Sequence, residues 1–172
     1  ADYLMKPFEN QDVLRILRSG DRKDGYDGHR YRITRIMEQL AEASGDIEEL
    51  VAIKSRDLSS AYHYLDIAEI FTKAGQPDKA LEWAERGLKA FPDHPDNRLR
   101  DFLVAVYLER KRHDEALQLT WIQFEERPIL DHYAKLHDVA GKLGVWPVQR
   151  ERALIKVAEM IAREAATTNR WK

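Results

Sequence analysis

The stretch Tyr64–Pro92 reads YLDIAEIFTKAGQPDKALEWAERGLKAFP, and the stretch Arg100–Pro128 reads RDFLVAVYLERKRHDEALQLTWIQFEERP. Ala80 of the first stretch recurs as Ala116 of the second, and the final prolines match as well, which gives a period of 36 residues. A repeat of this length with helical spacing of its apolar residues is typical of stacked helix hairpins. The repeat therefore predicts an all-α solenoid.

The first stretch contains the residue types that an antiparallel helix hairpin needs. Small residues at Ala68 and Ala80 allow two helices to approach closely, and large residues such as Phe71 fill the space around that contact. Gly75 suits the turn, and Pro92 discourages further helix. These residues, in these places, resemble a tetratricopeptide repeat (TPR). The resemblance implies antiparallel hairpins that stack into a right-handed superhelix.

The second stretch departs from the TPR pattern at three positions. Val104 stands where a small residue is expected, Lys111 replaces the turn glycine, and Gln123 replaces the second small residue. The two residues that lengthen the period are assigned to the loop 93–96. We expect the hairpin to form in spite of these changes, which leave the angle between its helices open.

Weaker helical patterns flank the two repeats. Asp46, followed by Glu49, predicts the capped start of a helix after Gly45. We expect hairpins at about 31–56, 60–91, 97–127 and 130–166, all within one TPR-like domain that spans 29–172. Residues 1–28 are expected to form a short helix and a flexible loop, because Val13, Leu14, Ile16 and Leu17 make one apolar stripe before a segment rich in Gly and Asp.

A narrower resemblance covers residues 68–92 together with Arg98–Leu103, Glu115–Leu117 and Trp121. These residues are similar to the helical C-terminal region of bacterial SWIM-type zinc-finger proteins. The SWIM motif itself is a Cys/His zinc site, and this chain has no cysteine. The resemblance implies a bacterial protein in which this chain is the helical companion of a metal module outside the given sequence.

Composition and charge exclude several classes of protein. The absence of cysteine excludes a disulfide framework and fits a reducing compartment, so we expect a cytoplasmic protein. No apolar run reaches the length of a membrane span. The formal charge of −2 gives no overall bias toward nucleic acid, although residues 38–69 carry eight acids against Lys54 and Arg56. Solvated helix faces or a polar partner would each explain that acidic segment.

Chemically active residue patterns are not evident. His132 and His137 are five positions apart, so they lie on different helix faces and lack metal-ligand spacing. Glu48–Glu49 and Glu125–Glu126 are sequence neighbours that point in different directions on a helix. Arg150, Lys156 and Arg163 form a basic stripe, but glutamates interleave with it. We therefore expect no catalytic residue, no metal and no cofactor.

The surface predicted for binding is the groove that the first helices of successive hairpins would line. A mixture of aromatic, aliphatic and charged residues on that face suits a protein partner with apolar anchors and both signs of charge. The predicted groove residues are Tyr62, Leu65, Glu69, Lys73, Arg98, Asp101, Phe102, Glu109 and Lys135.

The sequence thus predicts a non-enzymatic protein–protein interaction scaffold. The ends of the chain lead us to expect a fragment of a larger protein, so the partner is a separate protein or peptide, or another region of the same full-length protein. The alternative is a helical companion of a zinc finger that acts in nucleic-acid-associated regulation. The oligomeric state does not follow from the sequence.

Overall fold

The structure, a computed structural model, describes residues 27–92 and 96–168, with side chains described for 31–92 and 96–166. The predicted short helix at Asn10–Leu17 and most of the loop 20–28 lie outside these residues. All regular elements among the described residues are α-helices. The chain forms two compact units, with the boundary between Phe91 and Pro92. Each unit is described by itself.

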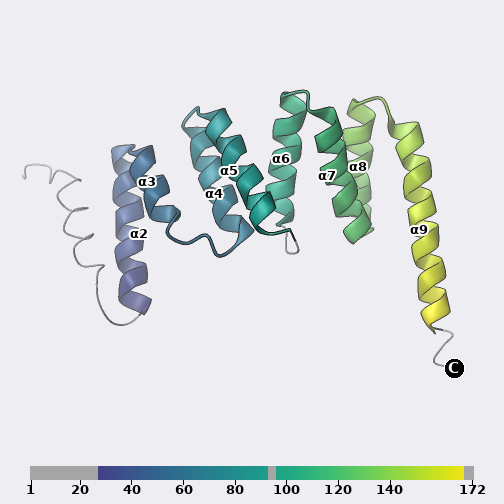
Figure 1. Cartoon of the computed structure of the whole chain (residues 1–172), viewed down its shortest axis with the longest axis horizontal. Coiled ribbons are helices and arrows are strands. Elements are labelled where there is room, and N and C mark those ends of the chain that lie inside the picture. The colour runs from purple at the N-terminus through teal and green to yellow at the C-terminus, as the bar shows by residue number, and fades with distance from the viewer. Residues whose placement is uncertain (1–26, 93–95, 169–172) are drawn as a thin grey trace, which may run out of the picture. The chain divides into compact units, whose positions relative to one another are not determined.

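The first unit contains two antiparallel helix hairpins (Figure 1). The first hairpin joins α2 (Asp27–Ser44) to α3 (Ile47–Lys54), and the second joins α4 (Ala61–Lys73) to α5 (Pro77–Ala90). The helix α2 begins inside the segment that we expected to be a loop. An aspartate in the first turn favours a helix N-terminus, and helix ends are the least predictable part of a pattern.

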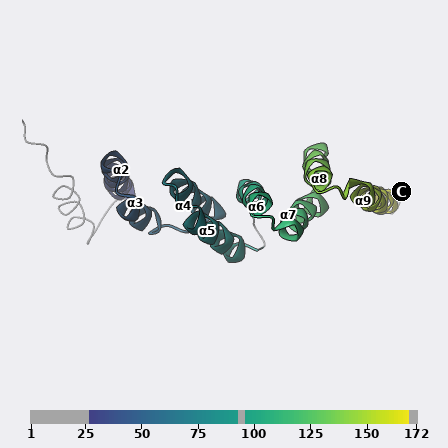
Figure 2. The same cartoon turned by 90° about the horizontal axis from the view of Figure 1, so that it is seen from above.

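The second unit also contains two hairpins. One joins α6 (Asn97–Glu109) to α7 (His113–Glu126), and the other joins α8 (Leu130–Lys142) to α9 (Trp146–Thr168). In the view from above, the two helices of each pair are seen nearly end on and lie side by side (Figure 2). The four hairpins in the two units give the fold its TPR-like, all-α character.

The turns between paired helices share one backbone conformation. Gly45, Gly75 and Gly144 have φ values of 71°, 70° and 72°, and Lys111 occupies the same left-handed region with φ of 58°. Each of these residues directly follows the last turn of a first helix, so it reverses the chain. The glycines in the sequence predicted where these turns lie. Lys111 adopts the same left-handed backbone conformation although it carries a side chain.

Asp46 caps α3 as predicted, because its Oδ1 accepts a hydrogen bond from the Glu49 amide at 2.9 Å. Ser60 stands at the N-cap position of α4, but its side chain makes no capping hydrogen bond. A side-chain cap such as that of Asp46 provides a hydrogen-bond acceptor for a backbone amide that has no partner within its own helix.

The small residues predicted to permit close packing are all buried. Ala68, Ala80 and Ala116 are each at most 2% exposed. The first unit has a buried cluster of Met37, Ala41, Leu50 and Ile53, and the second has a buried cluster of Trp121, Phe124, Leu136 and Ala153. In the second cluster the rings of Trp121 and Phe124 meet edge to face, with their centroids 5.7 Å apart. Each unit therefore has its own core.

Candidate functional site

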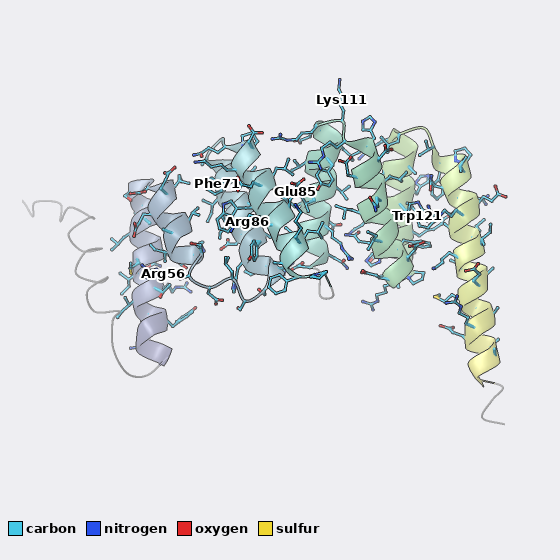
Figure 3. All side chains as sticks on the ribbon, viewed as in Figure 1. Arg56, Phe71, Glu85, Arg86, Lys111 and Trp121 are labelled. Atoms are coloured by element: carbon cyan, nitrogen blue, oxygen red, sulfur yellow. The ribbon has the colours of Figure 1, made fainter. Side chains whose placement is uncertain are left out.

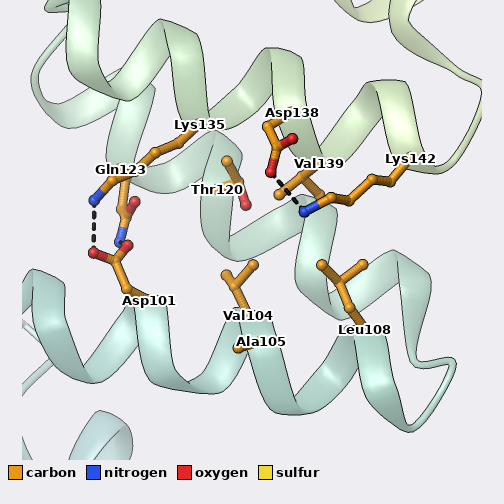
Figure 4. Close-up of a pocket in the computed structure, with 10 residues that line it drawn as sticks. All are labelled: Asp101, Val104, Ala105, Leu108, Thr120, Gln123, Lys135, Asp138, Val139 and Lys142. Carbon is orange, nitrogen blue, oxygen red and sulfur yellow. Dashed lines mark hydrogen bonds and ion pairs between the residues drawn. The ribbon is translucent and has the colours of Figure 1, made fainter.

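A hollow of about 550 Å³ lies in the second unit, between the first helices of its two hairpins (Figure 4). We call it the α6–α8 hollow. The helices α6 and α8 form its two sides and α7 contributes the remaining residues. It is lined by Asp101, Val104, Ala105, Leu108, Thr120, Gln123, Lys135, Asp138, Val139 and Lys142.

The sequence spacing explains why these residues share one surface. On α6 they occur at positions i, i+3, i+4 and i+7 from Asp101 to Leu108, and on α8 they occur at the same spacing from Lys135 to Lys142. Residues with this spacing lie on one face of a helix. Two helix faces with the same pattern thus border the same hollow.

The middle of the hollow is apolar. Val104, Ala105 and Leu108 come from α6 and Val139 comes from α8. In the close-up, the side chains of Val104 and Leu108 point from α6 toward the residues of α7 and α8 (Figure 4). An apolar surface of this kind favours contact with apolar groups of a ligand.

Two ion pairs border this apolar surface. Lys135 Nζ lies 2.6 Å from Asp101 Oδ2, and Lys142 Nζ lies 2.7 Å from Asp138 Oδ2. Gln123 Nε2 donates to the other oxygen of Asp101 at 3.0 Å, so side chains of α7 and α8 both hold this carboxylate of α6. The pair Lys135–Asp101 consequently links two successive hairpins and fixes one end of the hollow.

A second hollow of about 710 Å³ occupies the corresponding place in the first unit, between α2 and α4. We call it the α2–α4 hollow. Its lining is more polar than that of the α6–α8 hollow, with charged and tyrosine side chains around the buried Ile53. It is lined by Tyr31, Thr34, Glu38, Ile53, Lys54, Arg56, Asp57, Tyr62, His63 and Asp66.

The predicted groove residues are distributed between the two units. Asp101 and Lys135 meet in the α6–α8 hollow, and Tyr62 lines the α2–α4 hollow. Phe102 is half-buried on α6. The remaining predicted residues that lie exposed on α4 and α6, outside both hollows, are Glu69, Lys73, Arg98 and Glu109.

Leu65 corrects the prediction. It was assigned to the binding face, but it is only 5% exposed and belongs to the core of α4. Leu65 belongs to the buried face of α4, because burial of a leucine side chain is more favourable in free energy than its exposure to water.

The sequence analysis missed several residues of the α6–α8 hollow. Val104 and Gln123 were interpreted only as departures from the TPR pattern, although both line the hollow. The repeated spacing on α6 and α8 was the available signal. Gln123 is 1% exposed, so it contributes to the hollow through its hydrogen bond to Asp101.

Two histidines of α8, His132 and His137, make packing and hydrogen-bond contacts. His132 is buried, and its Nδ1 lies 2.8 Å from the carbonyl oxygen of Arg127, which can only accept, so Nδ1 donates. The ring of His137 packs edge to face on Trp146, with centroids 4.6 Å apart. Within residues 27–92 and 96–168, no group of three or more His, Asp or Glu side chains could hold a metal ion. No helix of that part of the chain is long and apolar enough to cross a membrane.

A family model matches residues 5–138, which is more than half of the chain, and its description is "Family of unknown function (DUF6880)". The chain belongs to this family. No curated protein matches the chain. The DUF6880 match ends at Asp138, within α8, so it includes most of the residues that line the two hollows. The resemblance to the helical region of SWIM-type proteins stays a prediction.

Two solved structures are similar to this member of the DUF6880 family. The crystal structure of MamA is 13% identical with a TM-score of 0.53, over 91% of this chain and 89% of the MamA chain. A chain in the structure of Naa15/Naa10 bound to HypK-THB is 14% identical with a TM-score of 0.51, over 90% of this chain and 25% of that chain. At such identities the likeness shows the fold alone, and the fold is of the TPR type.

Proposed function

We propose that this protein is a non-enzymatic protein interaction module and that the α6–α8 hollow receives side chains of its partner. The observation that carries the proposal is an apolar surface, made by α6 and α8, between two ion pairs. Protein interfaces commonly have this composition, with an apolar centre and a polar rim. The volume of about 550 Å³ is also within the range of roughly 300–1,000 Å³ that is usual for ligand sites.

The ion pairs define what kind of partner suits the hollow. Asp101 and Asp138 each have a lysine at hydrogen-bond distance, so a partner does not have to neutralise them. Its binding energy comes mainly from burial of apolar side chains against Val104, Leu108 and Val139. The matching partner is therefore a segment with an apolar anchor flanked by polar residues.

The neighbouring structures support a role in protein complexes. One of them holds Naa15/Naa10 bound to HypK-THB, so a fold like this one occurs in a protein assembly. The hypothesis includes the finer expectations from the sequence: a bacterial cytoplasmic protein, a piece of a longer chain, and a partner that is either a separate protein or another region of the same full-length protein. The companion of a zinc-finger module is the other form of this hypothesis.

Site-specific photo-crosslinking tests the proposal. Ala105 is exposed and lines the α6–α8 hollow, so a benzophenone amino acid placed there lies beside any bound segment. We expect a specific crosslinked product in cells that express the protein, and mass spectrometry then identifies the partner. A link within one chain would show that another region of the same protein fills the hollow.

A matched pair of variants then tests the identified contact with purified components. Ala105→Arg fills the hollow and should weaken binding by about tenfold or more, since tenfold corresponds to about 1.4 kcal/mol of lost contact. Ala52→Arg makes the same change at an exposed position of α3 outside both hollows and should leave affinity unchanged. Equal crosslinking from positions 105 and 52, or equal affinity of both variants, would contradict the proposal.

A further inference from the structure

The α2–α4 hollow contains one lysine surrounded by carboxylates. Lys54 Nζ lies 2.7 Å from Asp66 Oδ2 and 3.9 Å from Glu38 Oε1. Burial by itself lowers the pKa of Lys54, but the hydrogen bond and charge of Asp66, together with the charges of Glu38 and Glu42, outweigh it and leave the pKa raised. The two carboxylates Glu38 and Asp66 near one ammonium group leave an excess of negative charge in this part of the hollow.

Glu38 is the carboxylate that remains able to accept another donor. Its distance of 3.9 Å from Lys54 Nζ is too long for a hydrogen bond, and its side chain is 28% exposed. Asp66, by contrast, is engaged at hydrogen-bond distance. A second cation in the hollow could thus bind Glu38 without breaking the pair between Lys54 and Asp66.

Two tyrosines of the same hollow are exposed to an unusual degree for large rings. Tyr31 is 65% exposed and Tyr62 is 46% exposed. Tyrosine rings attract cations through their faces, and the planar guanidinium group of arginine can stack on a ring while it donates two hydrogen bonds to a carboxylate.

The charge of the surrounding chain acts in the same direction. Residues 38–69 carry eight acids against two bases, and the hollow is lined by residues of this segment. The lining itself contains the three carboxylates of Glu38, Asp57 and Asp66 against the two bases Lys54 and Arg56, and His63 Nδ1 lies 3.5 Å from Asp57 Oδ1. The electrostatic field of this excess negative charge attracts basic ligands and increases their association rate.

We propose that the α2–α4 hollow binds an arginine side chain from a basic segment of a protein partner. The guanidinium group forms a salt bridge with Glu38 and stacks on the exposed ring of Tyr62. The inference adds a partner chemistry to the proposed interaction function and rests on it. It concerns the first unit only, so it can be tested separately from the α6–α8 hollow.

The test uses the full chain and four fluorescent peptides with the same glycine–serine host sequence. Two central positions carry arginine, lysine, citrulline or glutamate, and citrulline has nearly the shape of arginine without its charge. Fluorescence anisotropy should show the arginine peptide binding about two- to fivefold more tightly than the citrulline peptide, the range for a solvent-exposed ion pair. The difference should shrink when salt is raised from about 0.02 M to about 0.5 M.

Three variants locate the site. Glu38→Gln removes the acceptor charge and should reduce arginine binding to the level of citrulline, and Tyr62→Leu should weaken arginine more than lysine. Glu82→Gln on α5 removes the same charge at an exposed position outside both hollows and should change nothing. Circular dichroism and thermal unfolding of each variant show that it is folded.

Two results would overturn the inference: equal affinity for the arginine and citrulline peptides, or equal losses in Glu38→Gln and Glu82→Gln. The variant Ala105→Arg should bind the arginine peptide normally. If it loses a natural partner but keeps this peptide, the two hollows act separately. If Glu38→Gln keeps the peptide, the arginine site fails while the interaction function of the α6–α8 hollow stands.

Discussion

Lys111 shows how one residue can keep a turn that the repeat pattern assigns to glycine. Its φ of 58° lies in the left-handed region, beside values of 70° to 72° at the glycines of the other hairpin turns. The side chain points away from the helices at the tip of the α6–α7 hairpin (Figure 3). Contacts of the Lys111 side chain with the protein therefore do not offset the cost of this backbone conformation. For residues with a Cβ, this conformation costs roughly 1–2 kcal/mol.

Replacement of Lys111 by glycine should therefore stabilise the protein. We expect Lys111→Gly to raise the free energy of unfolding by about 1 kcal/mol, after allowance for the greater freedom of glycine in the unfolded chain. Urea denaturation followed by circular dichroism measures the change.

Two controls separate backbone strain from side-chain effects. Lys111→Ala retains a Cβ and should give no gain. Gly75→Ala should cost about 1 kcal/mol through the backbone alone, because a Cβ at Gly75 would meet nothing within 4 Å. A gain for Lys111→Ala equal to that of Lys111→Gly would mean that the lysine side chain, and not its φ, is unfavourable.

At the scale of elements, α6 and α7 are held together by a buried arginine. Arg100 is 3% exposed, and its two terminal nitrogens pair with both oxygens of Glu126, with Nη2 at 2.7 Å from Oε1. Nη1 also lies 3.3 Å from Asn97 Oδ1, whereas the buried Nε has no hydrogen-bond partner. The hydrogen bonds from Arg100 lower the pKa of Glu126 and, together with the smaller effects of the charges of Arg100 and His132, outweigh burial, which raises it.

Glu126→Gln should destabilise the protein by about 1.5–2 kcal/mol at neutral pH, because the buried guanidinium group loses its counter-charge. The pKa of Glu126 is lower in the folded state than its ordinary value of 4.5, so the stabilisation is complete above that pH. It is lost as the pH falls through the folded pKa. The difference in stability between wild type and variant should consequently shrink as the pH is lowered from 5 toward 3.

Urea denaturation at a series of pH values measures this difference. Asp138→Asn is the matched control, since the pair Asp138–Lys142 is exposed and should contribute less than about 0.5 kcal/mol. A difference for Glu126→Gln that stays constant from neutral to acid pH would show that the ion pair is not its source.

At the scale of the whole molecule, a substitution in the core of one unit should destabilise mainly that unit, because the two units have separate cores. Phe124 is 1% exposed in the core of the second unit, and Ile53 is 1% exposed in that of the first. Phe124→Ala should cost about 3–4 kcal/mol and Ile53→Ala about 2–4 kcal/mol. Repeat proteins need not unfold in a single step, because each repeat contacts only its neighbours.

Native-state hydrogen exchange with mass spectrometry tests this expectation. Phe124→Ala should reduce amide protection mainly in residues 97–168, and Ile53→Ala should reduce it mainly in residues 31–91. The two variants act as controls for each other. Equal loss of protection in both units from either variant would show that the chain unfolds as one cooperative body.

The ends of most helices were predictable to within a few residues. The alanines and the turn glycines allowed contacts and turns within one hairpin to be predicted, and Asp46 allowed the start of α3 to be predicted. These features were predictable because they join residues that are close in the sequence. The burial of Arg100 and of Leu65 was not predictable, since both depend on which helix faces meet.

The sequence by itself determined the fold class, the hairpin turns and the small residues at their contacts, because helix periodicity and backbone preferences are local properties. Only the tertiary structure decided where the surface becomes hollow. Asp101 and Lys135 stand 34 positions apart and meet because three helices pack together, and Lys54 gathers Glu38 and Asp66 from two other helices. Spacing along one helix fixes which residues share a face, but packing between helices selects which faces come together.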